Sequence, residues 1–116
     1  MARYKWLVFT NCAAGAEAAF NRWYDEVHIA DLLRVPGIVG ARRSELTQAQ
    51  LTMETGDPEL CGPERIGAKH RFLAVYDIEA EDPMPVLEEI RARANTAEMP
   101  ITPDLAEAWT VLYRDF

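Results

Sequence analysis

Three apolar runs rich in aromatic and β-branched residues constrain the fold of this chain most. They cover residues 4–10 (YKWLVFT), 72–78 (FLAVYDI) and 109–113 (WTVLY). Such composition is typical of β-strands. A weaker run of the same kind, residues 38–44, follows a Pro36-Gly37 turn. The sequence therefore predicts four strands, two at the ends of the chain and two in its middle.

Two helical segments separate these strands. Residues 16–33 contain the Ala, Glu, Arg and Leu that helices favour, and Pro36-Gly37 supplies a stop signal after them. At 100° per residue, one stripe about 100° wide collects the inward-facing candidates of this helix, namely Phe20, Trp23, Tyr24, Val27 and Asp31. A second helix is predicted near residues 84–94, with Pro83 and Pro85 at its first turn.

The resulting order, β-α-β-β-α-β, is that of a ferredoxin-like α+β fold. It predicts a four-stranded antiparallel sheet with two helices on one face. A length of 116 residues with 49% apolar content fits a single domain, residues 1–116. The connection Thr47–Ala68 is long for a hairpin, and such segments are more often lids or partner-binding segments than plain connectors.

Both faces of the predicted sheet are apolar. In the first strand Trp6 and Val8 point to one face and Leu7 and Phe9 to the other, and the third and last strands alternate in the same way. Two helices can cover only one face of a four-stranded sheet. Because two-fold pairing is the commonest way to bury such a surface, we expect a homodimer.

Charge and composition exclude several classes of partner. The 19 Asp and Glu residues outnumber the 12 Lys and Arg residues, giving a net charge of -7, so nucleic acids and anionic membranes are not expected partners. No apolar run approaches the roughly 20 residues of a membrane span. The first nine residues, interrupted by Lys5, do not predict a signal peptide, and Cys12 and Cys61 are predicted to be reduced thiols. These features predict a cytoplasmic protein.

A candidate acid–base group lies in the first helix. His28 is four residues after Tyr24 and three before Asp31, so the three side chains can share one helix flank. Histidine is the side chain best suited to proton transfer near neutral pH. The structural alternative is a hydrogen-bonded His28 and an Asp31 that only caps the turn before Pro36-Gly37.

This segment resembles a known group of proteins. The match comprises Trp23, Tyr24, His28, Asp31, Pro36, Gly37 and the pair Arg42/Arg43. The pattern is similar to that of EthD-like and related small proteins of the dimeric α/β-barrel superfamily, which includes polyketide cyclases, muconolactone isomerases, cofactor-independent monooxygenases and haem-handling proteins. The resemblance implies a ferredoxin-like subunit whose sheet pairs with that of its partner to form a barrel. The chain departs from many EthD-like members at Ala30, where a proline often follows the histidine, and in its long insertion Thr47–Ala68.

We expect a substrate cleft between the first helix and the sheet. Its predicted walls are Trp6, Trp23, Phe72 and Tyr76. Asn11 is a candidate amide donor to a developing oxyanion. Arg42 or Arg43 would anchor a carboxylate or phenolate, and the sequence does not decide which of them faces inward. His70 is a weaker candidate, expected on the same face as Phe72 and Tyr76.

Neither a metal nor a cofactor is expected. His28 and Asp31 offer two ligands where a catalytic zinc normally takes three from the protein, and no glycine-rich phosphate loop occurs. The resemblance leaves haem ligation by His28 open, but its neighbours Tyr24 and Asp31 suit proton transfer better.

The leading hypothesis is a cofactor-independent enzyme of isomerase, cyclase or lyase type. It would act on a small aromatic or polyketide-like carbonyl compound in catabolism or secondary metabolism. His28 would move the proton, Asp31 would orient it, and Tyr24 would bind the substrate oxygen. The alternative is a non-catalytic dimeric protein that binds a hydrophobic metabolite as accessory to a neighbouring enzyme. In a third interpretation His28 and Asp31 only hold the helix end.

Overall fold

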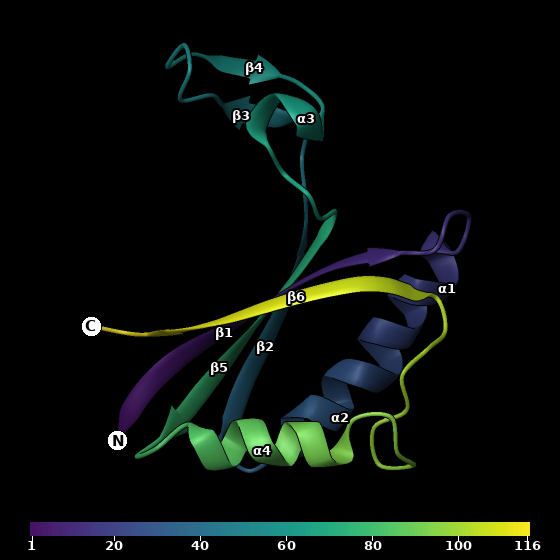
Figure 1. The fold of residues 1–116 in the computed structure, drawn as a ribbon, viewed down its shortest axis with the longest axis vertical. Coiled ribbons are helices and arrows are strands. Elements are labelled where there is room, and N and C mark those ends of the chain that lie inside the picture. The colour runs from purple at the N-terminus through teal and green to yellow at the C-terminus, as the bar shows by residue number, and fades with distance from the viewer.

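A computed structural model describes all 116 residues and contains one four-stranded antiparallel sheet with the main helices on one face (Figure 1). The strand order in this sheet is β2-β5-β1-β6. This arrangement confirms the predicted βαββαβ plan. The elements are β1 (Ala2–Cys12), α1 (Glu17–Trp23), η1 (Tyr24–His28), α2 (Ile29–Leu33), β2 (Ile38–Glu45), β3 (Ala49–Leu51), β4 (Pro58–Leu60), α3 (Pro63–Ile66), β5 (Phe72–Ala80), α4 (Met84–Arg93) and β6 (Leu105–Arg114).

The first helix is continuous from α1 to α2 but widens in its middle turn. The five residues of η1 form a π-helix, which holds an extra residue per turn and shifts the phase of everything that follows. As a result Val27, expected on the inward stripe, is 37% exposed. His28 turns toward the sheet in its place, and Leu32 joins Asp31 among the buried residues. The predicted stripe assumed the 3.6-residue period of a regular α-helix, and this assumption is wrong for the π-helical turn.

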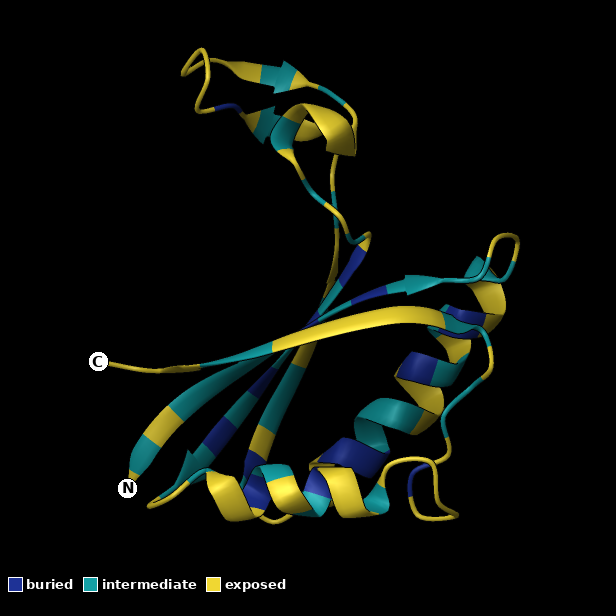
Figure 2. Cartoon of the chain, viewed as in Figure 1, coloured by how far each residue is buried: buried dark blue, intermediate teal, exposed yellow.

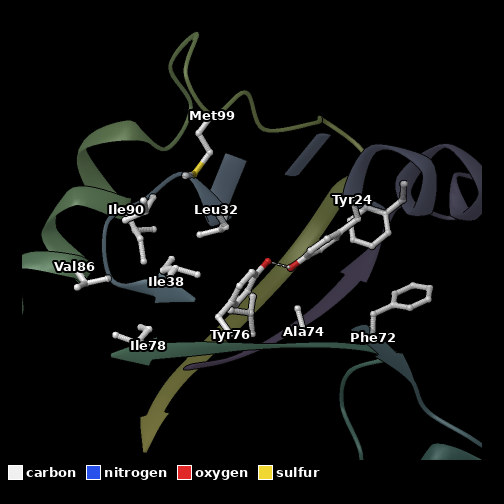
Figure 3. Close-up of a cluster of buried hydrophobic side chains, with 13 residues drawn as sticks. Tyr24, Leu32, Ile38, Phe72, Ala74, Tyr76, Ile78, Val86, Ile90 and Met99 are labelled. Carbon is white, nitrogen blue, oxygen red and sulfur yellow. Dashed lines mark hydrogen bonds between the residues drawn. The ribbon is translucent and has the colours of Figure 1, made fainter. Parts of the chain in front are cut away.

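The hydrophobic core fills the space between the helices and one face of the sheet. Its side chains come from alternate residues of the central strand β5, together with the inward residues of the helices (Figure 3). Phe20 and Tyr76 are fully buried there, and Phe20 contacts Phe72 with ring centroids 5.5 Å apart. The core therefore fixes the first helix tightly against β5.

The turn that ends the first helix depends on a glycine. Gly37 has a φ of +99°, a conformation that other residues rarely adopt, and a Cβ atom there would lie 2.7 Å from a methyl group of Val86 in α4. The Pro36-Gly37 turn, predicted to end the first helix, is thus also the point where α4 packs closely against the backbone of this turn.

The long connection Thr47–Ala68 forms an arm that projects away from the sheet (Figure 1). It holds a small hairpin of its own, in which β3 pairs with β4, followed by the single turn α3. Arg65 joins its parts by ion pairs to Glu54 and Glu59. Most residues of the arm are exposed (Figure 2).

The second face of the sheet carries no helix. Strand register places Leu7 and Phe9 of β1, Val75 of β5 and Trp109 of β6 on this open face. This confirms the separation of Leu7 and Phe9 from Trp6 and Val8 that the alternation predicted. Trp109 is 54% exposed. A sizeable apolar surface is therefore left uncovered by the chain itself.

Candidate functional site

A cavity of about 170 Å³ lies between the first helix and the sheet, where the sequence predicted a cleft. Trp6 of β1 and Trp23, Tyr24 and His28 of the first helix line it. The remaining lining side chains are almost all apolar. A cavity of roughly 150 Å³ is enough for a benzene-sized ligand, so this one accommodates a single ring.

His28 is a polar side chain on the wall of this cavity and is largely desolvated there. Its ring stacks on Trp23, with centroids 4.5 Å apart and planes 19° apart, and meets the edge of Tyr24 at 5.1 Å. Its Nδ1 atom is buried and has no hydrogen-bond partner. Burial lowers the pKa of His28 from its ordinary 6.5 to about 4, against a smaller opposing effect of the Asp31 carboxylate. The imidazole is therefore neutral at pH 7.

Tyr24 offers a hydroxyl donor beside this imidazole. The Tyr76 hydroxyl donates to the Tyr24 oxygen at 3.4 Å, which leaves the hydrogen of Tyr24 free to donate elsewhere (Figure 3). Burial raises the pKa of Tyr24, although the Tyr76 hydrogen bond and the Arg43 charge oppose this shift. Tyr24 thus keeps its proton at neutral pH.

Asp31 is buried but is not hydrogen-bonded to His28. Its Oδ1 accepts from Arg34 Nη1 at 2.6 Å, whereas its Oδ2 is buried without a partner. The carboxylate therefore acts on His28 only through its charge, and nothing in the structure shows it orienting the imidazole.

The two arginines that the sequence left open are now distinguished. Arg43 faces the helices, where its guanidinium donates to Asp25 and Asn21 and lies 4.3 Å from the centre of the Tyr24 ring. Arg42 is exposed and paired with Val75 in the register of the opposite face. The structure does not bring Arg42 to the cavity, because successive residues of a strand point to opposite faces.

Three other expected site residues also lie outside the cavity lining. Phe72 and Tyr76 are buried in the core behind it. Asn11 points to the base of the arm, where its Nδ2 donates to the Lys69 carbonyl at 2.8 Å and its Oδ1 accepts from the Arg71 N–H at 2.8 Å. The Asn11 side chain therefore anchors the backbone of Lys69 and Arg71 and does not donate into this cavity.

His70 lies on the other face from the one expected. Strand β5 begins only at Phe72, so strict alternation does not extend back to His70. Its ring lies 6.0 Å from that of Phe9 on the open face, and its Nε2 is 3.0 Å from Glu107 Oε1.

One wall of the cavity was missed by the sequence analysis. Met99 and Ile101, from the connection between α4 and β6, and Leu105, the first residue of β6, complete it. Trp23 Nε1 donates to the Pro100 carbonyl at 3.3 Å and so holds this connection against the first helix. Met99 and Ile101 lie in a segment with neither strand nor helix periodicity, and only their apolar character in this otherwise polar segment could have indicated burial.

The structure contains no group of three or more His, Cys, Asp or Glu side chains arranged to hold a metal ion. Cys12 and Cys61 are both free thiols. None of the helices has the length and apolar character needed to cross a membrane.

Comparison with known proteins gives similarity in structure only. No model of a known family matches the sequence, and no curated protein is detectably similar to it. A protein from Shewanella loihica PV-4, provisionally described as a monooxygenase, has a TM-score of 0.57 at 18% identity, over 100% of this chain and 97% of that one. An ethyl tert-butyl ether D (EthD) family protein from Bacillus halodurans C-125 has a TM-score of 0.53 at 12% identity, over the whole of both chains.

A third solved structure, from Thermobifida fusca YX, is described as a dimeric ferredoxin-like protein of unknown function. Its TM-score is 0.55 at 15% identity, over 97% of this chain and 90% of that one. At such identities the likeness establishes the fold and not the reaction. The chain accordingly has the ferredoxin-like fold, with structural similarity to an EthD family protein and to a dimeric ferredoxin-like protein.

Proposed function

We propose that the chain is an enzyme that moves a proton on a small apolar carbonyl compound held in the cavity beside His28. The observation that carries the proposal is the neutral His28 with a buried, unpartnered Nδ1 on the wall of an apolar cavity. A buried polar atom without a partner is costly, and a bound ligand would satisfy it. The volume favours a single-ring compound over a fused polyketide.

The chemistry divides between two side chains. His28 takes a proton from the carbon next to the carbonyl group, the electron pair of that C–H bond moves to the carbonyl oxygen, and the Tyr24 hydroxyl donates to this oxygen. In a compound with a double bond between its β and γ carbons, the electron pair then moves back from the oxygen through this double bond, and the γ carbon takes the proton from His28. The double bond is left conjugated with the carbonyl group, which gives an isomer. A pKa of about 4 makes the imidazole of the empty cavity a weak base. The enolate that forms beside it would raise this pKa, because a nearby negative charge favours the imidazolium.

The uncovered face supports a homodimer as the working form. Trp109 and Tyr113 on β6 are more than half exposed, and a second copy placed on the open face would bury them. The Thermobifida fusca protein with the same fold is described as dimeric. Light scattering should give twice the mass of one chain at micromolar concentration, and a monomer there would refute this part of the proposal.

The alternative is a non-catalytic protein that binds a hydrophobic metabolite for another enzyme. The low pKa of His28 favours it, since a neutral imidazole can accept a hydrogen bond from a ligand without transferring a proton. The two functions share the cavity but differ in whether a proton is exchanged with the ligand.

Exchange of hydrogen for deuterium on acetophenone in D₂O separates these functions. Wild-type protein should accelerate exchange at the methyl group next to the carbonyl, as followed by NMR. His28→Ala should lose about 10²–10⁴-fold of the acceleration, the usual contribution of a positioned acid or base. Val27→Ala is the matched control, because Val27 is the preceding residue of the same helix and faces solvent. Binding of acetophenone without accelerated exchange would support the alternative.

A further inference from the structure

The arm has an apolar face that the chain leaves uncovered. In its hairpin, Ala49 pairs with Leu60 and Leu51 pairs with Pro58, which places these four side chains on the same side. All four residues are exposed, Leu51 by 61% and Leu60 by 79%. Met53, in the turn that follows β3, is 89% exposed as well. The arm therefore presents an apolar surface, made of these four hairpin residues, to whatever lies beside it.

The opposite side of the hairpin is covered within the arm. Gln50 and Glu59 are opposite each other in the register and are half-buried on that side, and Arg65 of α3 forms an ion pair with Glu59 there. A two-stranded hairpin alone is only marginally stable in water and gains stability when it packs against another element. The covered side has such an element in α3, whereas the apolar side has none. This asymmetry favours a contact of the apolar side with a molecule outside the chain.

The position of the arm indicates which molecule this is. Leu46 and Lys69, which flank the arm, line a hollow together with Phe9 and Trp109 of the open face. Figure 1 shows the arm extending beyond the sheet, away from α2 and α4. A second copy of the chain seated on the open face would therefore fill this hollow and lie against the arm.

The charges of the arm and of the open face are complementary. Residues 47–68 contain one basic side chain and four acidic ones, namely Glu54, Asp57, Glu59 and Glu64. Asp57 and Glu64 form no ion pair within the chain, and neither does Arg42, which is exposed on the open face. In a pair of copies, unpaired acidic groups of one arm thus approach a face on which the other copy holds an unpaired cation. Such complementarity favours one partner and one orientation.

We propose that the arm is a dimerisation element, whose apolar face packs against a second copy of the chain seated on the open face. In a two-fold pair each arm contacts the other subunit, so every contact occurs twice. The inference rests on the pairing of two copies proposed above and is independent of the proton transfer. It assigns part of the subunit interface to a segment that pairing of the two sheets does not require.

Sedimentation equilibrium of the full chain at a series of dilutions tests this role. Leu51→Asp and Leu60→Asp should each raise the dissociation constant of the dimer at least about tenfold, because the added carboxylate is desolvated at two symmetric contacts. Met84→Asp is the matched control, since Met84 is 54% exposed, nearly as much as Leu51, but lies in α4 on the covered side of the sheet. It should change the dissociation constant by no more than about twofold. Circular dichroism checks that each variant is folded.

Hydrogen–deuterium exchange, read by mass spectrometry, locates the contact. In the wild-type chain, amides of the hairpin, residues 49–60, should exchange more slowly in the dimer than in the monomer obtained by dilution. In Leu51→Asp at the same concentrations this protection should be reduced, because a smaller fraction of the chain is paired.

Three results would overturn the role of the arm. Wild-type dissociation constants in both arm variants, with hairpin exchange independent of concentration, would leave pairing through the sheets intact and the apolar face of the arm free for a different protein. A wild-type chain that is monomeric at micromolar concentration would overturn the arm and the homodimer together. An equal weakening in Met84→Asp would mean that any added negative charge disfavours pairing, which also counts against a specific contact of the arm.

Discussion

The two histidines of this chain lie on opposite faces of one sheet, in opposite surroundings. His28 is desolvated among Trp23, Tyr24 and the core, and its Nδ1 has no partner. His70 lies at the rim of the uncovered face and is paired with the carboxylate of Glu107. The same residue type is thus held neutral by burial in one place and paired with a carboxylate in the other.

This difference follows from how the helices are distributed. They cover one face of the sheet and desolvate whatever lies beneath them, whereas the other face stays open until another molecule covers it. Environment, more than residue type, sets what each imidazole can do. The covered face suits proton transfer in a small dry cavity, whereas the open face is suited to pairing with a second copy of the chain.

The largest expected effect tests whether only the covered face forms a core. Phe20→Ala should lower the free energy of unfolding by about 3–5 kcal/mol, since Phe20 is fully buried and contacts the rings of Trp23, Tyr24 and Phe72. Urea unfolding monitored by circular dichroism measures the change. Tyr113→Ala, on the open face, should cost under about 0.5 kcal/mol at protein concentrations where the chain is monomeric. Comparable losses in both variants would mean that the open face is packed like the covered one.

The sequence predicted the two faces better than it predicted the site. Alternation correctly separated Trp6 and Val8 from Leu7 and Phe9 in the first strand, because the period of a strand is fixed by its pleat. The helix was less predictable, since the π-turn at Tyr24–His28 breaks the 3.6-residue period and exchanges Val27 for His28. No local composition signals such a turn.

The remaining differences between prediction and structure also arise where the local sequence pattern does not determine which way a side chain faces. His70 stands just outside a strand, where alternation no longer holds, and the choice between Arg42 and Arg43 depended on the register of β2 against β5. The connection that carries Met99 has no periodicity at all. Tertiary packing, and not sequence pattern, decides the position of each of these side chains.

The second effect is a dependence of the free energy of unfolding on pH that arises from His28. Its folded-state pKa of about 4 lies below the ordinary 6.5, so between these values the unfolded chain binds more protons than the folded one. Stability should therefore be fully present above pH 6.5 and fall as the pH drops toward 4, by about 3 kcal/mol in total. Urea midpoints at a series of pH values between 4 and 7 measure this loss.

His28→Ala removes the titrating group and should flatten this part of the profile. His70→Ala should retain it, because this variant leaves His28 and its surroundings in the helix-side cavity unchanged. The comparison between the two histidines fails if His70→Ala flattens the profile and His28→Ala leaves it unchanged.

The smallest expected change in the free energy of unfolding concerns Arg42 and Arg43, which are adjacent in β2 and therefore lie on opposite faces of the sheet. Arg43→Ala should cost about 1–2 kcal/mol, because its guanidinium lies 4.3 Å from the centre of the Tyr24 ring and is bound by Asp25 and Asn21. Arg42→Ala should stay within about 0.5 kcal/mol, since Arg42 is exposed. Arg43→Lys should fall between them, because lysine keeps the charge but not the planar fork that reaches two acceptors while lying over the ring. Urea unfolding of the three variants measures these losses. The largest loss for Arg43→Ala, an intermediate one for Arg43→Lys and the smallest for Arg42→Ala would show that charged side chains on the covered face also contribute to its packing. Equal losses at positions 42 and 43 would instead mean that the charge alone matters and that the facing of the strand does not.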